Sequence, residues 1–231
     1  MKSYIYHGKT YYIRESVNAY ISPYSLFMIE NYPLNISAGS TVCDFGAGTG
    51  LLGIIATYYA AGKICFIEID SQSCDLIREN CKFNQIAEKT PINIIKEAVD
   101  CNEVFDTIIC NPASLPEFIN KGSFCNGGPL GIDMILQVGE FSSKHLKTDG
   151  KLFMIITSIL PRSIVWNKFK NLGLRWNLVA EKEIAFREHY SGIREWVDNL
   201  SKIYPEMKYY VNDGKIYEKI GLYEIWKEGT Y

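Results

Sequence analysis

One stretch, residues 41–53 (TVCDFGAGTGLLG), constrains the fold of this 231-residue chain more than any other. A short apolar run typical of a β-strand comes first, three glycines follow at alternate positions, and an apolar helical pattern begins at Leu51. Glycine permits a tight or left-handed backbone and lets a ligand approach the chain closely. The stretch therefore predicts a strand, a ligand-binding loop and a helix, in that order.

Strands and helices are expected to alternate along most of the chain. Apolar runs predict strands at residues 41–45, 63–69, 91–95, 105–110, 151–157 and 178–186. Helical patterns lie between them at residues 51–60, 71–83, 131–146 and 161–172. This alternation is typical of βαβ units, in which a parallel sheet carries helices on both faces. A last apolar run at 215–226 predicts an antiparallel final strand. The expected fold class is thus α/β, with a single doubly wound, mostly parallel, seven-stranded and Rossmann-like sheet.

Two segments lie outside this alternation. In residues 1–40 we expect a hairpin turning at 7–9, then a helix that begins at the N-cap pair Ser22-Pro23, runs to about Tyr32 and ends at Pro33. Residues 187–209 have the pattern of an amphipathic insertion before the last strand. No linker or repeat divides the chain, so we expect one α/β domain.

The composition argues against several classes of function. The formal net charge of −2 gives no overall attraction for a polyanion, so no DNA tract is expected as a partner. The seven cysteines are odd in number and never spaced as C-x-x-C, which favours reduced core thiols in a cytoplasmic protein. With three scattered histidines, no metal site is expected. No apolar run reaches the roughly 18 residues of a membrane span, and residues 1–4 begin no signal peptide, so no membrane partner is predicted. The oligomeric state stays open.

Polar and glycine-rich segments follow the ends of the first strands. In an open parallel sheet, ligands bind outside the carboxyl ends of the strands, where the strand order reverses. This rule brings four segments to one edge of the sheet: the glycine loop at 46–50, Glu68, residues 95–98 and Asn111. We expect a single ligand site along that edge.

The glycine spacing narrows the choice of ligand. The dinucleotide fingerprint G-x-G-x-x-G requires glycine at position 51, and this chain has Leu51. Asp44 comes two residues before Gly46, where an acid would sit poorly beside a phosphate but suits a ligand that carries an ammonium group. S-adenosylmethionine has an ammonium and a sulfonium and no phosphate. A nicotinamide oxidoreductase is therefore disfavoured, and S-adenosylmethionine meets the requirement for an ammonium group without a phosphate.

These motifs resemble the class I S-adenosylmethionine-dependent methyltransferases over roughly residues 20–172. The resemblance rests on VCDFGAGTG at 42–50, on Glu68, on REN at 78–80 and on Asn111-Pro112. Asn111-Pro112 is similar to the start of the Asn-Pro-Pro-aromatic motif of N-methyltransferases. The segment GGPLGID at 127–133 resembles the one that follows this motif in the release-factor glutamine and related small-domain methyltransferases.

The resemblance implies roles for individual residues. The three glycines would let the cofactor approach the backbone, Glu68 would accept hydrogen bonds from the ribose hydroxyls, and Ile69 would lie against the adenine. Ala98 stands where an acid usually reads the adenine amino group, which leaves Glu97 or Asp100 as substitutes. The implied cofactor site comprises Asp44, Gly46, Gly48, Gly50, Glu68, Ile69, Ala98 and Asn111.

The catalytic residues implied are Asn111 and Pro112. The Asn111 side-chain oxygen and the Pro112 carbonyl would accept the hydrogens of an amide or amine nitrogen as it attacks the methyl group. The family motif continues with a second proline and an aromatic, whereas this chain has Ala113 and Ser114. Aromatic residues from elsewhere could replace the missing ring, and the candidates are Tyr24, Phe118 and Phe124.

Three functions stay open. The first is N-methylation of a protein, RNA or small-molecule acceptor. The altered motif also admits a scaffold protein that binds S-adenosylmethionine without turnover, or a methyltransferase of a small metabolite. In the expected organisation, residues 1–40 cover the site, 41–231 form the S-adenosylmethionine-binding catalytic domain, and an insertion near 187–214 lies on the substrate side.

Overall fold

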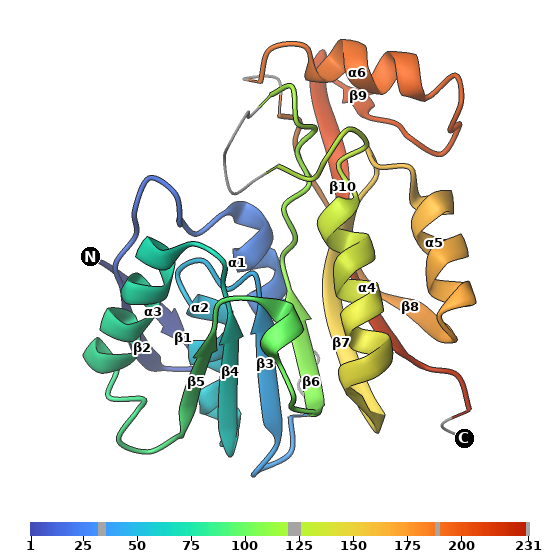
Figure 1. The fold of residues 1–231 in the computed structure, drawn as a ribbon. Helices are drawn as coiled ribbons and strands as arrows, with labels where there is room; N and C mark the ends of the chain where they lie inside the picture. Colours follow the sequence, from blue (N-terminus) through green and yellow to red (C-terminus); the bar gives the residue numbers. More distant parts are fainter. Residues whose placement is uncertain (32–35, 120–125, 188–189, 230–231) are drawn as a thin grey trace.

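A mixed β-sheet forms the centre of the protein in the computed structural model (Figure 1). The structure describes residues 1–31, 36–119, 126–187 and 190–229. The expectations for Tyr32, Pro33, Phe124 and Cys125 lie outside the described residues. Seven strands run in the order β5-β4-β3-β6-β7-β10-β8, and β9 pairs with β10 as an eighth. Their bounds are β3 Thr41–Phe45, β4 Lys63–Ile67, β5 Ile92–Ile95, β6 Phe105–Cys110, β7 Leu146–Thr157, β8 Leu174–Ala185, β9 Tyr210–Asn212 and β10 Lys215–Lys227.

The strand directions confirm the predicted fold class. β3 is parallel to β4 and β6, β4 to β5, and β6 to β7. β10 is antiparallel to both of its long neighbours, β7 and β8, as the last strand was expected to be. β9 was not predicted, because three residues are too few to carry a period and the strand forms only by pairing with β10.

Alternate residues of each strand face opposite sides of the sheet, and both sides are covered. Val42 and Ile64 belong to a core shared with α1, α2 and α3, whereas Cys43 and Cys65 belong to a second core shared with α4 and α5. All six described cysteines are free and buried, as expected. The helices are α1 Pro23–Glu30, α2 Leu51–Ala56, α3 Ser71–Phe83, α4 Asp133–His145, α5 Arg162–Asn171 and α6 Ile193–Leu200, with short 3₁₀ turns η1 Thr57–Tyr59 and η2 Ala98–Asp100.

Several predicted boundaries were wrong, and the largest error is at the strand predicted at 151–157, which begins at Leu146. The strand predicted at 63–69 ends at Ile67, because the next side chain, Glu68, turns back to the glycine loop. The strand predicted at 178–186 begins at Leu174, since its ladder with β10 extends to the Leu174–Lys227 pair. The helix predicted from residue 51 to 60 is α only to Ala56 and continues as η1.

The N-terminal residues form the expected hairpin, β1 Lys2–Tyr6 and β2 Lys9–Ile13. The hairpin docks on α3, where Asn80 and Asn84 each exchange hydrogen bonds with its backbone, at Arg14 and Tyr12 respectively. At the other end of the chain, α6 lies beside the loop that follows β6 (Figure 1). Within the described residues, no helix is both long and apolar enough to cross a bilayer.

Candidate functional site

A cavity of about 600 Å³ opens at the carboxyl ends of β3, β4 and β6. This volume lies within the ~300–1,000 Å³ typical of small-molecule and cofactor sites. The order of the strands reverses between β3 and β6, so the cavity occupies the topological switch point. The expected site residues that line it are Asp44, Gly46, Gly48, Glu68, Ile69, Ala98, Asn111 and Pro112.

The cavity has two halves. The glycine-loop half is lined by residues 44–49, 51–52, 67–69 and 96–98. The Asn111 half is lined by residues 111–115, by side chains of the first turn of α1, and by Arg187 and Tyr190. Among the residues that the structure describes, no three His, Cys, Asp or Glu side chains gather as metal ligands would.

The glycine loop has a left-handed backbone where the sequence places glycines. Gly46 has a φ of +69°, and a Cβ there would lie 2.1 Å from the Met134 side-chain methyl. Gly48 has a φ of +54°, faces the cavity and donates its N–H to Glu68. Gly50 is buried and does not line the cavity. A Cβ on it would lie 3.3 Å from Ile77, so this glycine serves the turn into α2 and its packing.

Glu68 closes the loop from the end of β4. One carboxylate oxygen accepts the Gly48 N–H at 2.8 Å and the other accepts the Asp70 N–H at 2.9 Å. Burial raises the pKa of Glu68, and these two backbone donors oppose the shift. Asp70 instead caps α3, where its carboxylate accepts the Ser73 N–H. Glu68 is therefore the acid that faces the cavity after β4.

Asp44 is buried beneath the same loop. Its carboxylate accepts the Gly53 N–H at 2.8 Å, so one oxygen holds the first turn of α2. Burial raises the pKa of Asp44 to about 7, against the Gly53 hydrogen bond and with a smaller contribution from Glu68. The side chain changes charge near neutral pH while lining the cavity.

An apolar edge completes the glycine-loop half. Ile69 is 62% exposed although it is a large aliphatic residue, and it lines the cavity. Ala98 lies in η2 on the same wall, with Lys96 and Glu97 beside it. Of the two acids considered as substitutes at this position, Glu97 lines the cavity and Asp100 does not.

Asn111 lies at the end of β6, opposite the first turn of α1. Its side-chain nitrogen donates to the Ser22 hydroxyl at 3.1 Å and to the Ser25 hydroxyl at 2.9 Å. Ser22 is the N-cap of α1, as predicted, and accepts the Ser25 N–H. Pro112 is buried next to it and lines the cavity.

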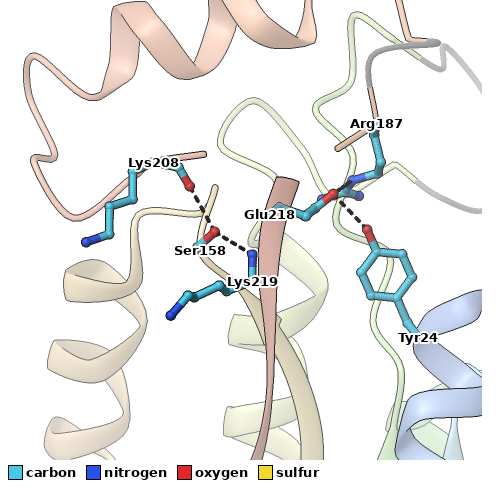
Figure 2. Close-up of polar contacts among 6 residues, drawn as sticks. All are labelled: Tyr24, Ser158, Arg187, Lys208, Glu218 and Lys219. Atoms are coloured by element: carbon cyan, nitrogen blue, oxygen red, sulfur yellow. Dashed lines mark hydrogen bonds and ion pairs between the residues drawn. The ribbon is translucent and has the colours of Figure 1, made fainter. Parts of the chain in front are cut away.

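A buried ion pair stands behind the Asn111 half. Figure 2 shows the Tyr24 hydroxyl and the Arg187 guanidinium converging on the Glu218 carboxylate. Arg187 makes two hydrogen bonds to it, at 2.8 and 3.0 Å, and its guanidinium lies 5.4 Å from the centre of the Tyr24 ring. Burial raises the pKa of Tyr24 well above its ordinary value, so the hydroxyl remains a donor. Glu218 is fully buried, and Arg187 and Tyr24 separate it from the cavity that they line.

The insertion is held at its return by Ser158, which follows β7. The Ser158 hydroxyl donates to the Lys208 carbonyl and accepts the Lys219 N–H (Figure 2). At its start, Arg187 pairs with Glu218 on the same strand, β10. Both ends of the insertion are thus fixed to adjacent residues of β10.

Comparison with known proteins gives this geometry a context. The pattern of the ribosomal protein L11 methyltransferase (PrmA) family matches residues 23–116. The L11 methyltransferase of Dictyoglomus turgidum is 23% identical over 163 residues, which cover 70% of this chain and 47% of that protein. A putative protein N5-glutamine methyltransferase of Methanocaldococcus jannaschii is 28% identical over 153 residues, 64% of this chain and 77% of that protein. The chain thus spans about half the length of the first of these relatives.

A solved structure decides the fold. The ribosomal protein L11 methylase of Lactobacillus delbrueckii subsp. bulgaricus matches 88% of this chain and 78% of its own, with a TM-score of 0.55 at 17% identity. The chain has the class I methyltransferase fold. In this class I fold, the cavity at the switch point is where a ligand of the parallel sheet is expected.

Several residues of the site were missed from the sequence. Of the three aromatic candidates, Tyr24 lines the cavity, Phe118 does not, and Phe124 lies outside the described residues. Arg187 was assigned only to an amphipathic insertion. A signal for its partner was present, since Glu218 occupies the same face of the last strand as the buried Ile220. An acid at such a position requires a buried partner.

Proposed function

We propose that the protein is an S-adenosylmethionine-dependent methyltransferase that acts on a nitrogen acceptor. The observation that carries the proposal is the meeting of Asn111-Pro112 with the glycine loop and Glu68 in one cavity. Asn111-Pro112 suits a nitrogen nucleophile. The glycine loop and Glu68 suit a nucleoside that has an amino-acid tail. The methyltransferase relatives support the same reaction class.

The lining of the glycine-loop half fits S-adenosylmethionine. Each Glu68 oxygen accepts one backbone N–H and keeps acceptor capacity for a ribose hydroxyl. The exposed Ile69 side chain offers an apolar surface for an adenine ring. Asp44, when ionised, favours an ammonium group nearby. The cofactor site proposed here comprises Asp44, Gly46, Gly48, Glu68, Ile69, Ala98 and Asn111, with Gly50 shaping the loop from below.

When bound, S-adenosylmethionine supplies an electrophilic methyl group on a sulfonium. The protein must then hold the acceptor nitrogen in line with that methyl group, and orientation supplies much of the rate. The Asn111 side-chain oxygen and the Pro112 carbonyl accept the nitrogen-bound hydrogens and stabilise the positive charge that grows on nitrogen. As the nitrogen–carbon bond forms the carbon–sulfur bond breaks, the donor leaves as a neutral thioether, and the methylated nitrogen releases its extra proton to water afterwards. No base therefore has to act before attack.

The acceptor is proposed to be an amide or amine of a protein, an RNA or a small molecule. The relatives named for ribosomal protein L11 and for protein glutamine put a protein acceptor first. We also propose that residues 1–40 cover the site of the catalytic domain at 41–231, with the insertion near 187–214 on the acceptor side. In support, Ser22, Ser25 and Arg187 line the cavity.

Two measurements test the function. Titration calorimetry should detect S-adenosylmethionine binding, and tritiated methyl groups should pass to the protein or RNA fraction of a bacterial extract. Asn111→Ala should lower the rate about 100-fold or more, whereas the exposed control Asn102→Ala should leave it unchanged. Absence of binding at millimolar cofactor would refute the proposal.

A second candidate is a scaffold that binds the cofactor without turnover. Ala113 and Ser114 favour it, since both line the cavity where an aromatic ring would stack on a planar acceptor. Tight cofactor binding with no methyl transfer to protein, RNA or small-molecule fractions would select this candidate.

A further inference from the structure

The first turn of α1 contacts both the Asn111 amide and the buried ion pair. Ser22 and Ser25 accept hydrogen bonds from the Asn111 side-chain nitrogen, and Tyr24, between them, donates to Glu218 at 3.0 Å. Ser22 and Asn111 are 89 residues apart in the chain, and Tyr24 and Glu218 are 194 apart. One helical turn thus joins the end of β6 to the first part of β10.

The hydrogen bonds fix which end of the amide faces the cavity. A primary amide has two N–H donors on its nitrogen and acceptor capacity on its oxygen. Both serine hydroxyls lie on the nitrogen side of Asn111, at 3.1 and 2.9 Å. The two hydroxyls also share a hydrogen bond at 3.3 Å, so one of them has its only hydrogen engaged and can only accept from the amide. They therefore hold the nitrogen end of Asn111, which lines the cavity, and leave its Oδ1 as an acceptor.

We propose that Ser22 and Ser25 are positioning residues that orient the Asn111 amide so that its oxygen, and not its nitrogen, faces the methyl acceptor. The proposal rests on the proposed function of Asn111. If the Asn111 amide were turned by 180°, its N–H groups would face the NH₂ group of the methyl acceptor. That NH₂ group also presents N–H hydrogens to Asn111, so no hydrogen bond could form. The two hydroxyls therefore determine whether the site can hold a nitrogen nucleophile.

The turn that carries the two serines is itself held in place. Pro23 occupies the first helical position with its φ preset, and the Ser22 oxygen caps the helix. Tyr24 then joins this turn to Glu218, which Arg187 fixes through two hydrogen bonds (Figure 2). A buried, paired carboxylate has one geometry, so it gives the turn a rigid reference point. The distance from Asn111 to the hydroxyls is set by this arrangement.

A spectroscopic test reads the orientation without any methyl acceptor. The side-chain amide signals of Asn111 are assigned by NMR as those lost in Asn111→Asp. In the double variant Ser22→Ala/Ser25→Ala they should move toward exposed-amide positions and exchange with water roughly 10- to 30-fold faster. The single variant Ser25→Thr keeps a hydroxyl at this position and should therefore keep the wild-type Asn111 signals. Ser143→Ala, which removes a hydroxyl bonded only within α4, is the matched control.

The same variants are then compared in methyl transfer to bacterial extract and in calorimetry. Ser25→Ala keeps the Ser22 cap and should lower the initial rate about tenfold, and the double variant about 100-fold. The dissociation constant for S-adenosylmethionine should change less than about twofold, because the serines act on the acceptor side. Unchanged Asn111 signals in the double variant would overturn the inference. A wild-type protein that binds no cofactor would instead refute the proposed function, independently of the NMR result.

Discussion

The glycine-loop half of the cavity is built from residues close in sequence, whereas the Asn111 half joins segments that lie far apart in the chain. Asp44 contacts Gly53, nine residues away, and Glu68 contacts Asp70 and Gly48, two and 20 residues away. In the other half, Tyr24 contacts Glu218 across 194 residues. The glycine-loop half can be recognised in the sequence as a motif, whereas the Asn111 half depends on the topology of the whole sheet. The following predictions test this contrast, from the largest expected effect to the smallest.

The stability of the Asn111 half should depend on the buried ion pair between Arg187 and Glu218. Arg187→Leu leaves the Glu218 carboxylate buried and without its cation, and should lower the free energy of unfolding by about 3–5 kcal/mol, measured by urea denaturation. Glu181→Gln breaks the exposed pair with Lys219 and should leave the free energy of unfolding almost unchanged. A loss as small as that of Glu181→Gln would show that this half is not held by the pair.

The glycine-loop half should make the free energy of unfolding depend on pH through Asp44. Asp44 has a pKa of about 7 in the folded protein, above the ~3.9 of an unfolded aspartate, so the folded state holds the proton more tightly. Its contribution to stability is full below about pH 4 and is lost as the pH rises through 7. Between pH 5 and 8, the free energy of unfolding of the wild type should fall relative to that of Asp44→Asn by roughly 2 kcal/mol. Parallel pH curves for the two proteins would contradict this prediction.

Affinity for the proposed cofactor should depend on the glycine-loop half and not on the Arg187–Glu218 pair. Glu68→Gln turns an amide NH₂ toward either the Gly48 or the Asp70 N–H, and the clash of donors should weaken S-adenosylmethionine binding about 10- to 100-fold in calorimetry. The control is Glu79→Gln on the exposed face of α3. An equal loss of affinity in Arg187→Leu would erase the distinction between the two halves.

The smallest effect is expected at Ser158. Ser158→Ala removes the hydroxyl that bridges Lys208 and Lys219 and should cost about 1 kcal/mol of stability. Because the backbone bonds between these segments remain, the insertion should stay folded. Limited proteolysis should show faster cleavage within the insertion and no change elsewhere. Equal protection of the insertion in wild type and variant would mean that the hydroxyl is dispensable.

Much of the fold could be predicted because its signals are local. Apolar runs separated by helical periods specify βαβ units, and these units have a fixed handedness that leaves few arrangements of the sheet. The glycine loop was recognisable for the same reason. Gly50 was expected at the cavity and is not, since spacing alone does not distinguish a glycine that faces a ligand from one that faces Ile77.

The Asn111 half could be predicted only in part. Asn111 and the Ser22 cap were visible as short motifs, but their hydrogen bond depends on where α1 docks. Nothing near Arg187 in the sequence indicates that it is buried. Its environment is created by Glu218, which comes from a strand formed 31 residues later.

The position of β10 between β7 and β8 has a consequence for the order in which the protein forms during synthesis. β8 leaves the ribosome before β10, yet it has no place in the sheet until β10 has paired with β7. At ~5–20 residues per second, the glycine loop and its neighbouring strands are complete several seconds before Glu218 emerges. A nascent chain can therefore complete the glycine-loop half of the cavity first, and the Asn111 half only when β10 has taken its place between β7 and β8.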